Sequence, residues 1–189
     1  MKFETRKQQI IKTAAKLFKK KGYSAVTMRD LATEMGIKAA SLYNHISSKQ
    51  EILKIIIISL AEEFTIEMNN IRTSEGTSLD KLNKIVTLHI KTASENTYEM
   101  AALNNDWMHL EEQRDYYLKL RDVYEENFRN IIKSGIANQE LKEENVEVML
   151  FSMLSTLRSL YLWIPKKEDL NIEELKTSLS NVLIHGFNK

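Results

Sequence analysis

The sequence of 189 residues has no cysteine, a single proline and only five glycines. Without cysteine the chain has no disulfide framework, no thiolate nucleophile and no cysteine-ligated zinc site. The scarcity of helix-breaking residues favours helices. Hydrophobic residues make up 43% of the chain and charged residues 28%, which is the composition of a folded globular protein rather than a disordered one.

Long apolar runs are also missing. Ile55–Ile58 is a run of four isoleucines, and Lys54 and Ser59 flank it. A helix that spans a bilayer needs roughly 20 apolar residues. Residues 1–6 lack the apolar stretch and the small-residue cleavage site of a signal peptide. We therefore expect a cytoplasmic protein that does not associate with a membrane.

The charge is distributed unevenly although the net charge is only +1. Residues 1–50 hold 11 Lys and Arg against 3 Asp and Glu, which leaves 16 against 23 in residues 51–189. A basic segment joined to an acidic one indicates that the first part faces a polyanion such as nucleic acid. The alternative is that runs such as Lys19–Lys21 are merely solvated helix faces.

Apolar periodicity predicts an all-α fold of about nine helices, because no segment alternates apolar and polar residues long enough for a strand. Gly22, Gly36 and Gly135 are expected to end helices, and Thr27 is expected to cap one. Ser47 or Ser48, with Glu51 in a capping box, should begin the longest helix. The predicted helices are 3–21, 28–35, 39–46, 48–72, 78–94, 97–110, 112–134, 144–163 and 171–187.

Residues 27–46 have the pattern of a helix-turn-helix. Ala32 is small enough for a close helix crossing, and Gly36 suits the strained position of the turn. The apolar residues that would fill the wedge between the two helices are Leu31, Met35, Ile37, Leu42 and Ile46. A generic helical hairpin with the same wedge is the alternative, but it would not require a strongly basic segment.

The second helix of this motif would enter the DNA major groove. If Leu42 and Ile46 point inward, the polar side chains around them point outward, together with Arg29 on the preceding helix. Lys49 and the free amides at the start of the next helix are expected to meet phosphate. Base-edge contacts are expected from Ala39, Ala40, Ser41 and Asn44, and the outward-facing set also includes Tyr43 and His45.

Three segments carry a resemblance to the TetR family of transcriptional regulators. They are residues 10–23 (IIKTAAKLFKKKGY), 27–32 (TMRDLA) and 41–53 (SLYNHISSKQEIL), and the resemblance covers roughly residues 5–55. It implies an N-terminal three-helix DNA-binding domain, here residues 1–47, and a C-terminal helical domain for dimerisation and effector binding, here residues 48–189. It also implies a homodimer on a double-stranded operator, whose affinity commonly falls when a small effector binds.

Carried onto this chain, the resemblance gives Thr27, Tyr43, His45 and Lys49 the positions that usually hold the DNA backbone or position the recognition helix. The chain departs from the family pattern at three positions. Lys38 replaces the usual Ser or Thr cap, Ala40 stands where the family often has Gly, and Ile46 replaces the usual Phe. Losing the cap costs on the order of 1 kcal/mol, although Lys38 itself could reach a phosphate.

The two predicted C-terminal helices, 144–163 and 171–187, have apolar stripes. Such helices can pair with their symmetry mates as a four-helix interface, the arrangement that the resemblance implies. Half-sites one helical turn apart on DNA need this two-fold symmetry. The alternative is that both stripes pack only within one subunit.

Aromatic, methionine and a few polar residues make a pocket that accepts apolar molecules, but each of them is individually typical of a core. The candidates for effector binding are Met100, Trp107, His109, Tyr117, Tyr124, Met153, Arg158 and Trp163. Segments 117–129 and 161–165 are similar to TetR-family regulators of fatty-acid and acyl-CoA breakdown. That similarity implies an acyl-CoA-like or fatty-acid-like effector, with Arg158 or another cation opposite its phosphates or carboxylate.

The sequence gives little support for an enzyme or a metal protein. Asp106 and His109 have a chelating spacing, but a carboxylate-bridged site would need such pairs on two helices. No phosphate-cradling glycine loop or nucleophile elbow is present, so we expect no cofactor and no catalysis. The remaining alternative is a helical small-molecule-binding or interaction protein without specific DNA recognition.

Overall fold

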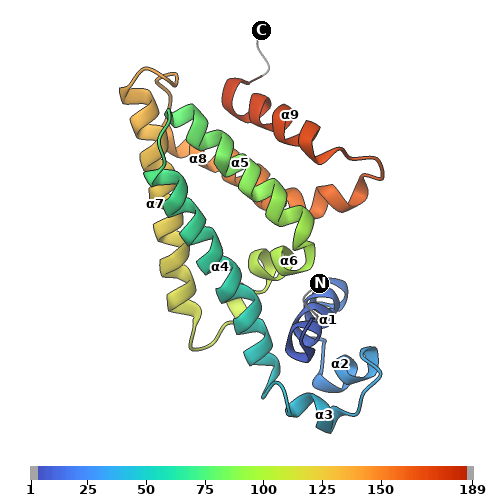
Figure 1. Ribbon diagram of the computed structural model, residues 1–189. Helices are drawn as coiled ribbons and strands as arrows, with labels where there is room; N and C mark the ends of the chain where they lie inside the picture. Colours follow the sequence, from blue (N-terminus) through green and yellow to red (C-terminus); the bar gives the residue numbers. More distant parts are fainter. Residues whose placement is uncertain (1–3, 187–189) are drawn as a thin grey trace. The chain divides into compact units, whose positions relative to one another are not determined.

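The computed structural model describes residues 4–186. Over this range the chain forms nine α-helices and two short 3-10 helices and no strand, which confirms the all-α class (Figure 1). The elements are α1 (Arg6–Lys21), α2 (Met28–Glu34), α3 (Ala39–Tyr43), α4 (Lys49–Thr73), α5 (Ser78–Glu95), α6 (Thr97–Asn105), η1 (Trp107–His109), α7 (Arg114–Ala137), α8 (Val146–Trp163), η2 (Ile164–Lys166) and α9 (Ile172–His185). The predicted helix ends at residues 3 and 187 lie outside the described residues.

Local side-chain caps explain where several helices begin. In three of them a threonine accepts a hydrogen bond from the backbone three residues later, while the side chain at that position accepts from the threonine N–H. These capping boxes are Thr5 with Gln8, Thr27 with Asp30 and Thr77 with Asp80. Each cap satisfies amides that have no partner inside the helix and stabilises it by about 1 kcal/mol.

The start of α4 follows the prediction, with one difference in its partners. The Glu51 N–H donates to Ser48 Oγ at 3.0 Å, so Ser48 caps the helix. The Glu51 carboxylate accepts from both the N–H and the hydroxyl of Ser47, each at 2.7 Å. The carboxylate therefore reaches one residue farther back than a standard capping box, and it fixes the loop that follows α3.

Helix α3 is shorter than predicted because it ends at Tyr43 rather than at residue 46. The N–H groups of His45 and Ile46 both donate to the Leu42 carbonyl, at 3.0 and 3.1 Å. The tighter His45 bond ends regular α-helix geometry, and Ile46 is nevertheless buried. The chain thus leaves the helix while keeping an inward-pointing apolar residue.

The expectation that Gly135 ends a helix is wrong. Helix α7 continues through Gly135 to Ala137. A Cβ atom at Gly135 would lie 2.7 Å from Leu141 Cδ1 and 2.9 Å from Ser78 Cβ. Glycine is present here because the start of α5 and the chain after α7 approach its backbone closely, and not because the helix must stop. The other two predictions hold, since Gly22 (φ 82°) and Gly36 (φ 64°) adopt the left-handed region where helices end.

The chain divides into two compact units. Unit 1 comprises Met1–Glu62 and Tyr98–Leu118, and unit 2 comprises Glu63–Thr97 and Lys119–Lys189. Helices α4 and α7 each contribute to both units. The predicted functional division at residues 47 and 48 stays a prediction, because unit 1 groups the start of α4 and the segment 98–118 with the first three helices.

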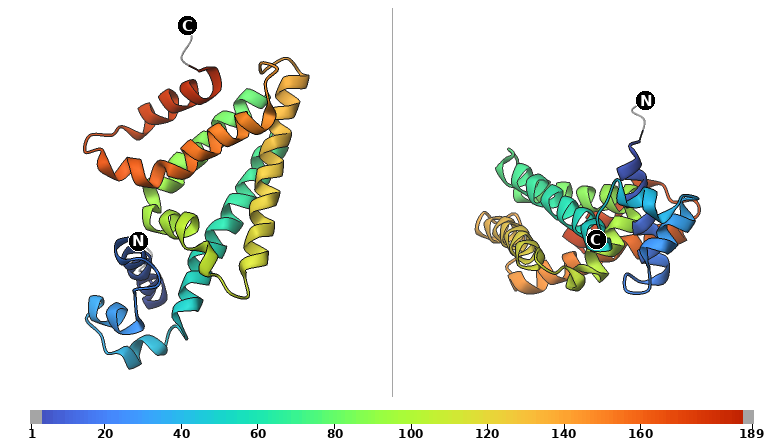
Figure 2. Two further views of the ribbon diagram at one scale, coloured as in Figure 1. Left: turned by 180° about the vertical axis from the view of Figure 1, so that it is seen from behind. Right: turned by 90° about the horizontal axis from the view of Figure 1, so that it is seen from below.

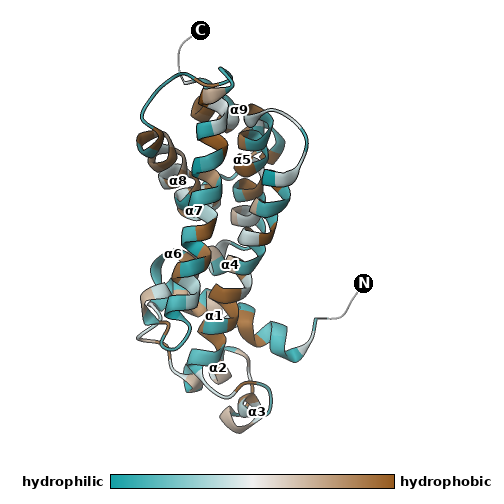
Figure 3. Cartoon of the chain, turned by 90° about the vertical axis from the view of Figure 1, so that its left-hand side faces the viewer, coloured by the Kyte–Doolittle hydropathy of each residue, from teal (hydrophilic) through white to brown (hydrophobic). Residues whose placement is uncertain are grey.

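Unit 1 has a core in which α1 packs on α2 and α2 packs on α3. In unit 2, α5 packs against both α8 and α9, an arrangement that can be followed in Figures 1 and 2. The apolar residues (brown in Figure 3) recur along the helices at intervals, as amphipathic helices require. The largest enclosed side chains of unit 1 include Ile10, Leu31, Leu42, Ile46, Ile52, Leu53 and Ile57, and those of unit 2 include Met68, Leu82, Ile85, Ile90 and Phe128.

Helix α8 is the most apolar segment. Within the described residues, Val146–Lys166 is long and apolar enough to cross a membrane by length and composition, and 33% of it is buried. Leu150, Leu154 and Leu157 are among its buried residues. Val148 and Phe151 on the same helix are 60% and 72% exposed, so an apolar face of α8 remains uncovered in the single chain.

We predict that Gly135→Ala lowers the free energy of unfolding by about 1–2 kcal/mol, because the clash with Ser78 Cβ outweighs the helix propensity gained over glycine. Urea denaturation measures this change. The neighbouring exposed Ser134 provides a matched control, and Ser134→Ala should be neutral or slightly stabilising. If Gly135→Ala were as stable as Ser134→Ala, the close approach would not constrain the fold.

Candidate DNA interface and effector-binding residues

The turn between α2 and α3 is built from backbone hydrogen bonds. The Gly36 N–H donates to the Thr33 carbonyl at 3.1 Å, and the Ile37 N–H donates to the Ala32 carbonyl at 3.0 Å. Gly36 has φ 64°, which a residue with a Cβ rarely adopts. This compact turn sends the chain from one helix into the next with no extended linker.

Four side chains form the wedge between α2 and α3. Leu31, Ala32, Leu42 and Ile46 are each at most 3% exposed. Met35 and Ile37, also expected in the wedge, are half-buried. Burying two or three leucine-sized side chains contributes about 1.5–3 kcal/mol each, so the rotation of α3 about its own axis is strongly determined.

The opposite face of α3 is open to solvent. Ser41, Tyr43, Asn44 and His45 are exposed, as the spacing around Leu42 predicts. Tyr43 is 54% exposed, which is unusual for a large aromatic side chain. Of the other residues expected at the interface, Thr27, Arg29, Lys38 and Ala40 are exposed and Ala39 is half-buried. Lys38, Ala39, Ala40, Ser41, Tyr43, Asn44 and His45 thus lie on or beside α3, whereas Thr27 and Arg29 lie at the start of α2.

The Thr27 hydroxyl and the Lys38 side chain differ in how much they are engaged. Thr27 Oγ1 donates to Asp30 Oδ2 at 2.6 Å and accepts from the Asp30 N–H at 3.1 Å. The hydrogen bond that the Thr27 hydroxyl donates, followed by the one that the Thr27 N–H donates to the same carboxylate oxygen at 2.8 Å, lowers the pKa of the Asp30 carboxyl. Lys38 is the N-cap residue of α3 but makes no side-chain cap bond, so its side chain stays available to an external anion.

Lys49 has a position that the sequence did not predict. Its ammonium donates to the carbonyls of Tyr23 and Val26, each at 2.9 Å, and lies 4.3 Å from the centre of the Tyr23 ring. The carbonyls belong to the loop between α1 and α2. The ammonium is therefore occupied within unit 1, where it ties the first turn of α4 to that loop.

Glu51 adds a second tie at the same place. Its carboxylate accepts from the Lys7 ammonium at 3.0 Å as well as from Ser47. The hydrogen bonds from Ser47, followed by that from Lys7, lower the pKa of Glu51 to about 2. Glu51 thus ties the chain after α3 to α1, and the link to Lys7 had no signal in the sequence.

The segment after α6 packs onto the same region of unit 1. The His109 ring stacks on Tyr23 with centroids 5.1 Å apart, and Gln50 Nε2 donates to the His109 carbonyl at 2.8 Å. A shallow pocket of about 610 Å³ borders these groups. His109, predicted to bind effector, therefore lies against the loop that Lys49 holds.

The other candidates in unit 1 lie on α6, η1 and α7. Met100 is 1% exposed, which is typical of a core residue. Trp107 and Tyr117 have ring centroids 5.8 Å apart, and the Tyr117 hydroxyl donates to the Leu103 carbonyl at 3.4 Å. Trp107 and Tyr117 thus form an aromatic contact between η1 and α7.

Unit 2 contains a buried polar pair that sequence reasoning missed. His89 Nε2 lies 2.8 Å from the Tyr124 hydroxyl oxygen, and both residues are at most 6% exposed. Phe64 packs on both rings, with centroids 4.8 and 5.8 Å away. Tyr124 was a candidate from the sequence, but a lone histidine on an apolar helix face gives no signal that distinguishes a binding residue from a core residue.

Arg158 lies beside this pair on α8. Its Nη2 donates to Glu125 Oε1 at 2.7 Å, and the same oxygen accepts from Arg121 Nε at 3.0 Å. Burial lowers the pKa of His89, and the nearby positive charge of Arg158 lowers it further, to about 3. His89 is therefore a neutral imidazole at physiological pH.

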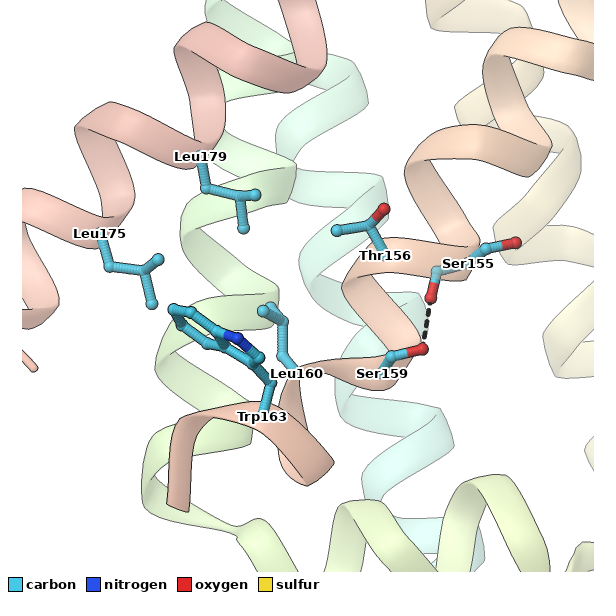
Figure 4. Close-up of a pocket in the computed structure, with 7 residues that line it drawn as sticks. All are labelled: Ser155, Thr156, Ser159, Leu160, Trp163, Leu175 and Leu179. Carbon is cyan, nitrogen blue, oxygen red and sulfur yellow. Dashed lines mark hydrogen bonds between the residues drawn. The ribbon is translucent and has the colours of Figure 1, made fainter. Parts of the chain in front are cut away.

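The remaining candidates, Met153 and Trp163, lie in separate pockets of unit 2. Met153 borders a pocket of about 370 Å³ near the N-terminal end of α5. Trp163 borders a groove of about 460 Å³ between α8 and α9, where its indole lies between Leu160 and Leu175 (Figure 4). Four of the eight candidates thus belong to unit 1, and the other four belong to unit 2.

Asp106 and His109, the pair with chelating spacing, are not joined by other metal-binding side chains. Within residues 4–186 no group of three or more His, Asp or Glu side chains is arranged to hold a metal ion. Burial raises the pKa of Asp106, and the charge of His109 opposes this in part.

Comparison with known proteins places this geometry in a family. Residues 10–56 match the model described as "Bacterial regulatory proteins, tetR family", and residues 75–187 match "Tetracyclin repressor-like, C-terminal domain". The chain is 21% identical over 184 residues to the HTH-type transcriptional repressor KstR2 of Rhodococcus jostii (strain RHA1), covering 96% of this chain and 90% of that protein. It is 27% identical over 145 residues to the uncharacterized HTH-type transcriptional regulator YfiR of Bacillus subtilis (strain 168), covering 74% and 69%.

Solved structures agree with this assignment. The TetR-family transcriptional regulator PfmR from Thermus thermophilus superimposes with a TM-score of 0.83 at 27% identity, covering 96% of this chain and all of that one. The ketosteroid transcriptional regulator KstR2 of Mycobacterium tuberculosis has a TM-score of 0.91 at 17% identity, covering 100% and 97%, which shows a shared fold. The helix-turn-helix geometry and both family matches show that the chain belongs to the TetR family of DNA-binding transcriptional regulators.

Proposed function

We propose that this protein is a homodimeric, cytoplasmic repressor that inserts the exposed face of α3 into the major groove of operator DNA and releases it when an effector binds. The observation that carries the proposal is the division of α3 into two faces. Leu42 is fully buried, whereas its neighbours Ser41, Tyr43 and Asn44 are exposed. A helix whose inner face is fixed by packing presents a preorganised outer face to base edges.

The contacts on DNA divide into two kinds. Ala39, Ala40, Ser41 and Asn44 are proposed to contact base edges, where a small side chain or an amide can discriminate between bases. Arg29, Lys38, Tyr43 and His45 are proposed to contact phosphates, together with the exposed Thr27 at the start of α2.

Lys49 is proposed to position the recognition helix and not to neutralise a phosphate. Its ammonium already has two carbonyl partners at 2.9 Å and a tyrosine ring. Moving it to a phosphate would leave the carbonyls of Tyr23 and Val26 without this donor. The role that the family resemblance allowed for this position, holding the recognition helix, is the one that this geometry supports.

The homodimer is proposed to form through the uncovered face of α8, together with α9. Val148, Phe151 and Leu162 are 60%, 72% and 48% exposed, which is costly for an apolar face in water. An antiparallel pair of α8 helices centred on Ser155 sets Phe151 opposite Ser159 and Val148 opposite Leu162. Small serines at the crossing point and large apolar residues on either side make this face self-complementary, as a two-fold interface requires.

The effector is proposed to be an apolar molecule, fatty-acid-like or acyl-CoA-like. Support comes from the sequence similarity of segments 117–129 and 161–165 and from Arg158, a cation beside an otherwise apolar and aromatic interior of unit 2. The relative of known structure, KstR2, is described as a ketosteroid transcriptional regulator, and an apolar effector is in keeping with that description.

Helix α4 is the proposed route from effector to DNA. It begins at Lys49, which holds the loop between α1 and α2, and it continues without a break into unit 2 as far as Thr73. A displacement of its second half changes the spacing of the two recognition helices in the dimer. The effector must bind the DNA-incompetent state more tightly, since equal affinity for both states would shift nothing.

We predict that the protein binds random duplex DNA with an affinity that falls steeply as salt increases, because phosphate neutralisation releases counterions. Fluorescence anisotropy at several salt concentrations measures the slope. With several phosphate contacts per dimer, affinity should fall at least tenfold between about 50 and 200 mM salt. Negligible affinity with a flat slope would instead favour the second candidate, an effector-binding or interaction protein without DNA recognition.

We predict that Lys38→Met and Lys49→Met act differently although both remove one lysine charge. Lys38→Met should reduce the salt slope by about one per subunit and leave stability within about 0.5 kcal/mol, because an exposed side chain is lost. Lys49→Met should lower the free energy of unfolding by about 1–3 kcal/mol, because buried carbonyls lose a charged donor. Urea denaturation and the salt titration measure the two effects, and identical behaviour of the variants would contradict the assignment.

We predict that Asn44→Ala mainly changes base preference, with a loss of about 1–3 kcal/mol on the preferred site only. Binding to a selected operator and to random duplex, measured side by side, gives this comparison. An equal loss of affinity on both duplexes would mean that Asn44 contacts the backbone.

We predict that Ser155→Cys forms a disulfide-linked dimer on mild oxidation. Because the chain has no other cysteine, any covalent dimer seen on a non-reducing gel reports this position. Ser134→Cys on α7 is the control and should stay monomeric on the gel. In a second variant, Phe151→Ser should shift the sedimentation coefficient toward that of a monomer. Pairing through α8 would be contradicted if Ser155→Cys gave no cross-link and Phe151→Ser remained a stable dimer.

A further inference from the structure

The buried pair in unit 2 leaves one polar atom without a partner. His89 is 3% exposed, and its Nδ1 is the one buried side-chain nitrogen or oxygen among the described residues with no hydrogen-bond partner. A buried polar group without a hydrogen-bond partner destabilises the fold. Such an atom therefore marks a place where something outside the protein chain completes the hydrogen bonding.

The hydrogen bond to Tyr124 decides what Nδ1 offers. If the Tyr124 hydroxyl donates to Nε2, only the Nδ1–H of the neutral imidazole is left unpaired. If Nε2–H donated to the Tyr124 oxygen, both the Nδ1 lone pair and the phenolic proton would lack partners. The first arrangement leaves fewer groups unsatisfied, so His89 presents a hydrogen-bond donor and its partner must supply an acceptor.

The surroundings of the pair define the rest of the ligand. Phe64 lies 4.8 Å from the His89 ring, and Phe128 lies 6.5 Å from the Tyr124 ring, centre to centre. Both are apolar walls. Arg158 is half-buried, and its Nη2 donates to Glu125; its positive charge acts on both His89 and Tyr124. An apolar body with an oxygen acceptor at one end, favoured further if it is anionic, suits these walls and donors.

We propose that the Nδ1–H of His89 anchors the effector by donating a hydrogen bond to the acyl oxygen of a carboxylate or thioester, with Arg158 favouring an anionic head group. This inference rests on the proposed function, because it names the chemistry of the effector of that same regulator. The inference goes beyond the proposed function because it assigns the anchoring group to His89, which the hydrogen bond from Tyr124 holds in its donor form.

The position of Phe64 connects this site to regulation. Phe64 belongs to α4, the helix whose first residue, Lys49, holds the loop between α1 and α2. Because His89 Nδ1 is buried, a ligand atom that reaches it must displace a side chain packed around the ring, and Phe64 is such a side chain. Displacement of Phe64 moves the helix that the proposed mechanism uses.

The test compares the wild type with the double variant His89→Phe/Tyr124→Phe in calorimetric titrations with decanoate and with decanoyl-CoA. Replacing both members of a hydrogen-bonded pair by apolar residues of similar shape is nearly neutral for stability, and urea denaturation checks this. Tyr161→Phe, which also removes a hydroxyl buried in unit 2, is the matched control. Decylammonium is the control ligand, since it carries a donor and a positive charge.

We expect the double variant to bind at least one of the two acyl probes about ten- to a hundredfold more weakly, because a hydrogen bond from a buried donor is lost. Tyr161→Phe should bind as the wild type does, and decylammonium should not bind. Weakening confined to decanoate identifies a free acid, and weakening confined to decanoyl-CoA identifies a thioester. Equal affinity of double variant and wild type for the probes overturns the anchor, and so does failure of both probes to bind the wild type.

The salt titration on duplex DNA, made with the same preparations, separates this inference from the proposed function. If the wild type binds DNA with a steep salt slope while neither acyl probe binds, the assignment of His89 is wrong and the DNA-binding function stands.

Discussion

The burial of Leu42 and Ile46 against Leu31 and Ala32 is the constraint on which the rest of the molecule depends, since it determines which side of α3 faces water. A rotation of this short helix by one residue would bury Tyr43 or Asn44 and expose an apolar wedge, at a cost of several kcal/mol. The bonds of Lys49 and Glu51 act on the same segment, because they tie the chain before α2 and after α3 to the first turn of α4.

Much of this arrangement could be predicted because it depends on local chemistry. The starts of α2 and α4 follow from the Thr27 and Ser48 caps, and the left-handed positions of Gly22 and Gly36 follow from their place where the apolar periodicity of a helix stops. The two faces of α3 follow from the spacing of Leu42 and Ile46 alone. For the same reason the all-α class could be inferred before any tertiary contact was known, whereas the family was inferred from the resemblance of residues 10–23, 27–32 and 41–53.

Features that depend on contacts between distant residues could not be predicted. Gly135 has the sequence context of a helix stop, yet it makes room for Ser78, which lies far away in the sequence. Lys49 has the position of a phosphate ligand, yet its partners are carbonyls of the preceding loop. The pairing of His89 with Tyr124 joins α5 to α7, and the sequence contains no pattern that specifies it. Effector candidates chosen by residue type alone were therefore divided between the two units.

The most direct test of the DNA-reading surface is an NMR titration of the isotope-labelled protein with duplex DNA, following each backbone amide. The account predicts that the largest shift changes fall on residues 38–45 and on the start of α2, while the amides of α9 change little. Unchanged signals across residues 38–45, with perturbations concentrated elsewhere, would contradict the claim that the exposed face of α3 contacts DNA.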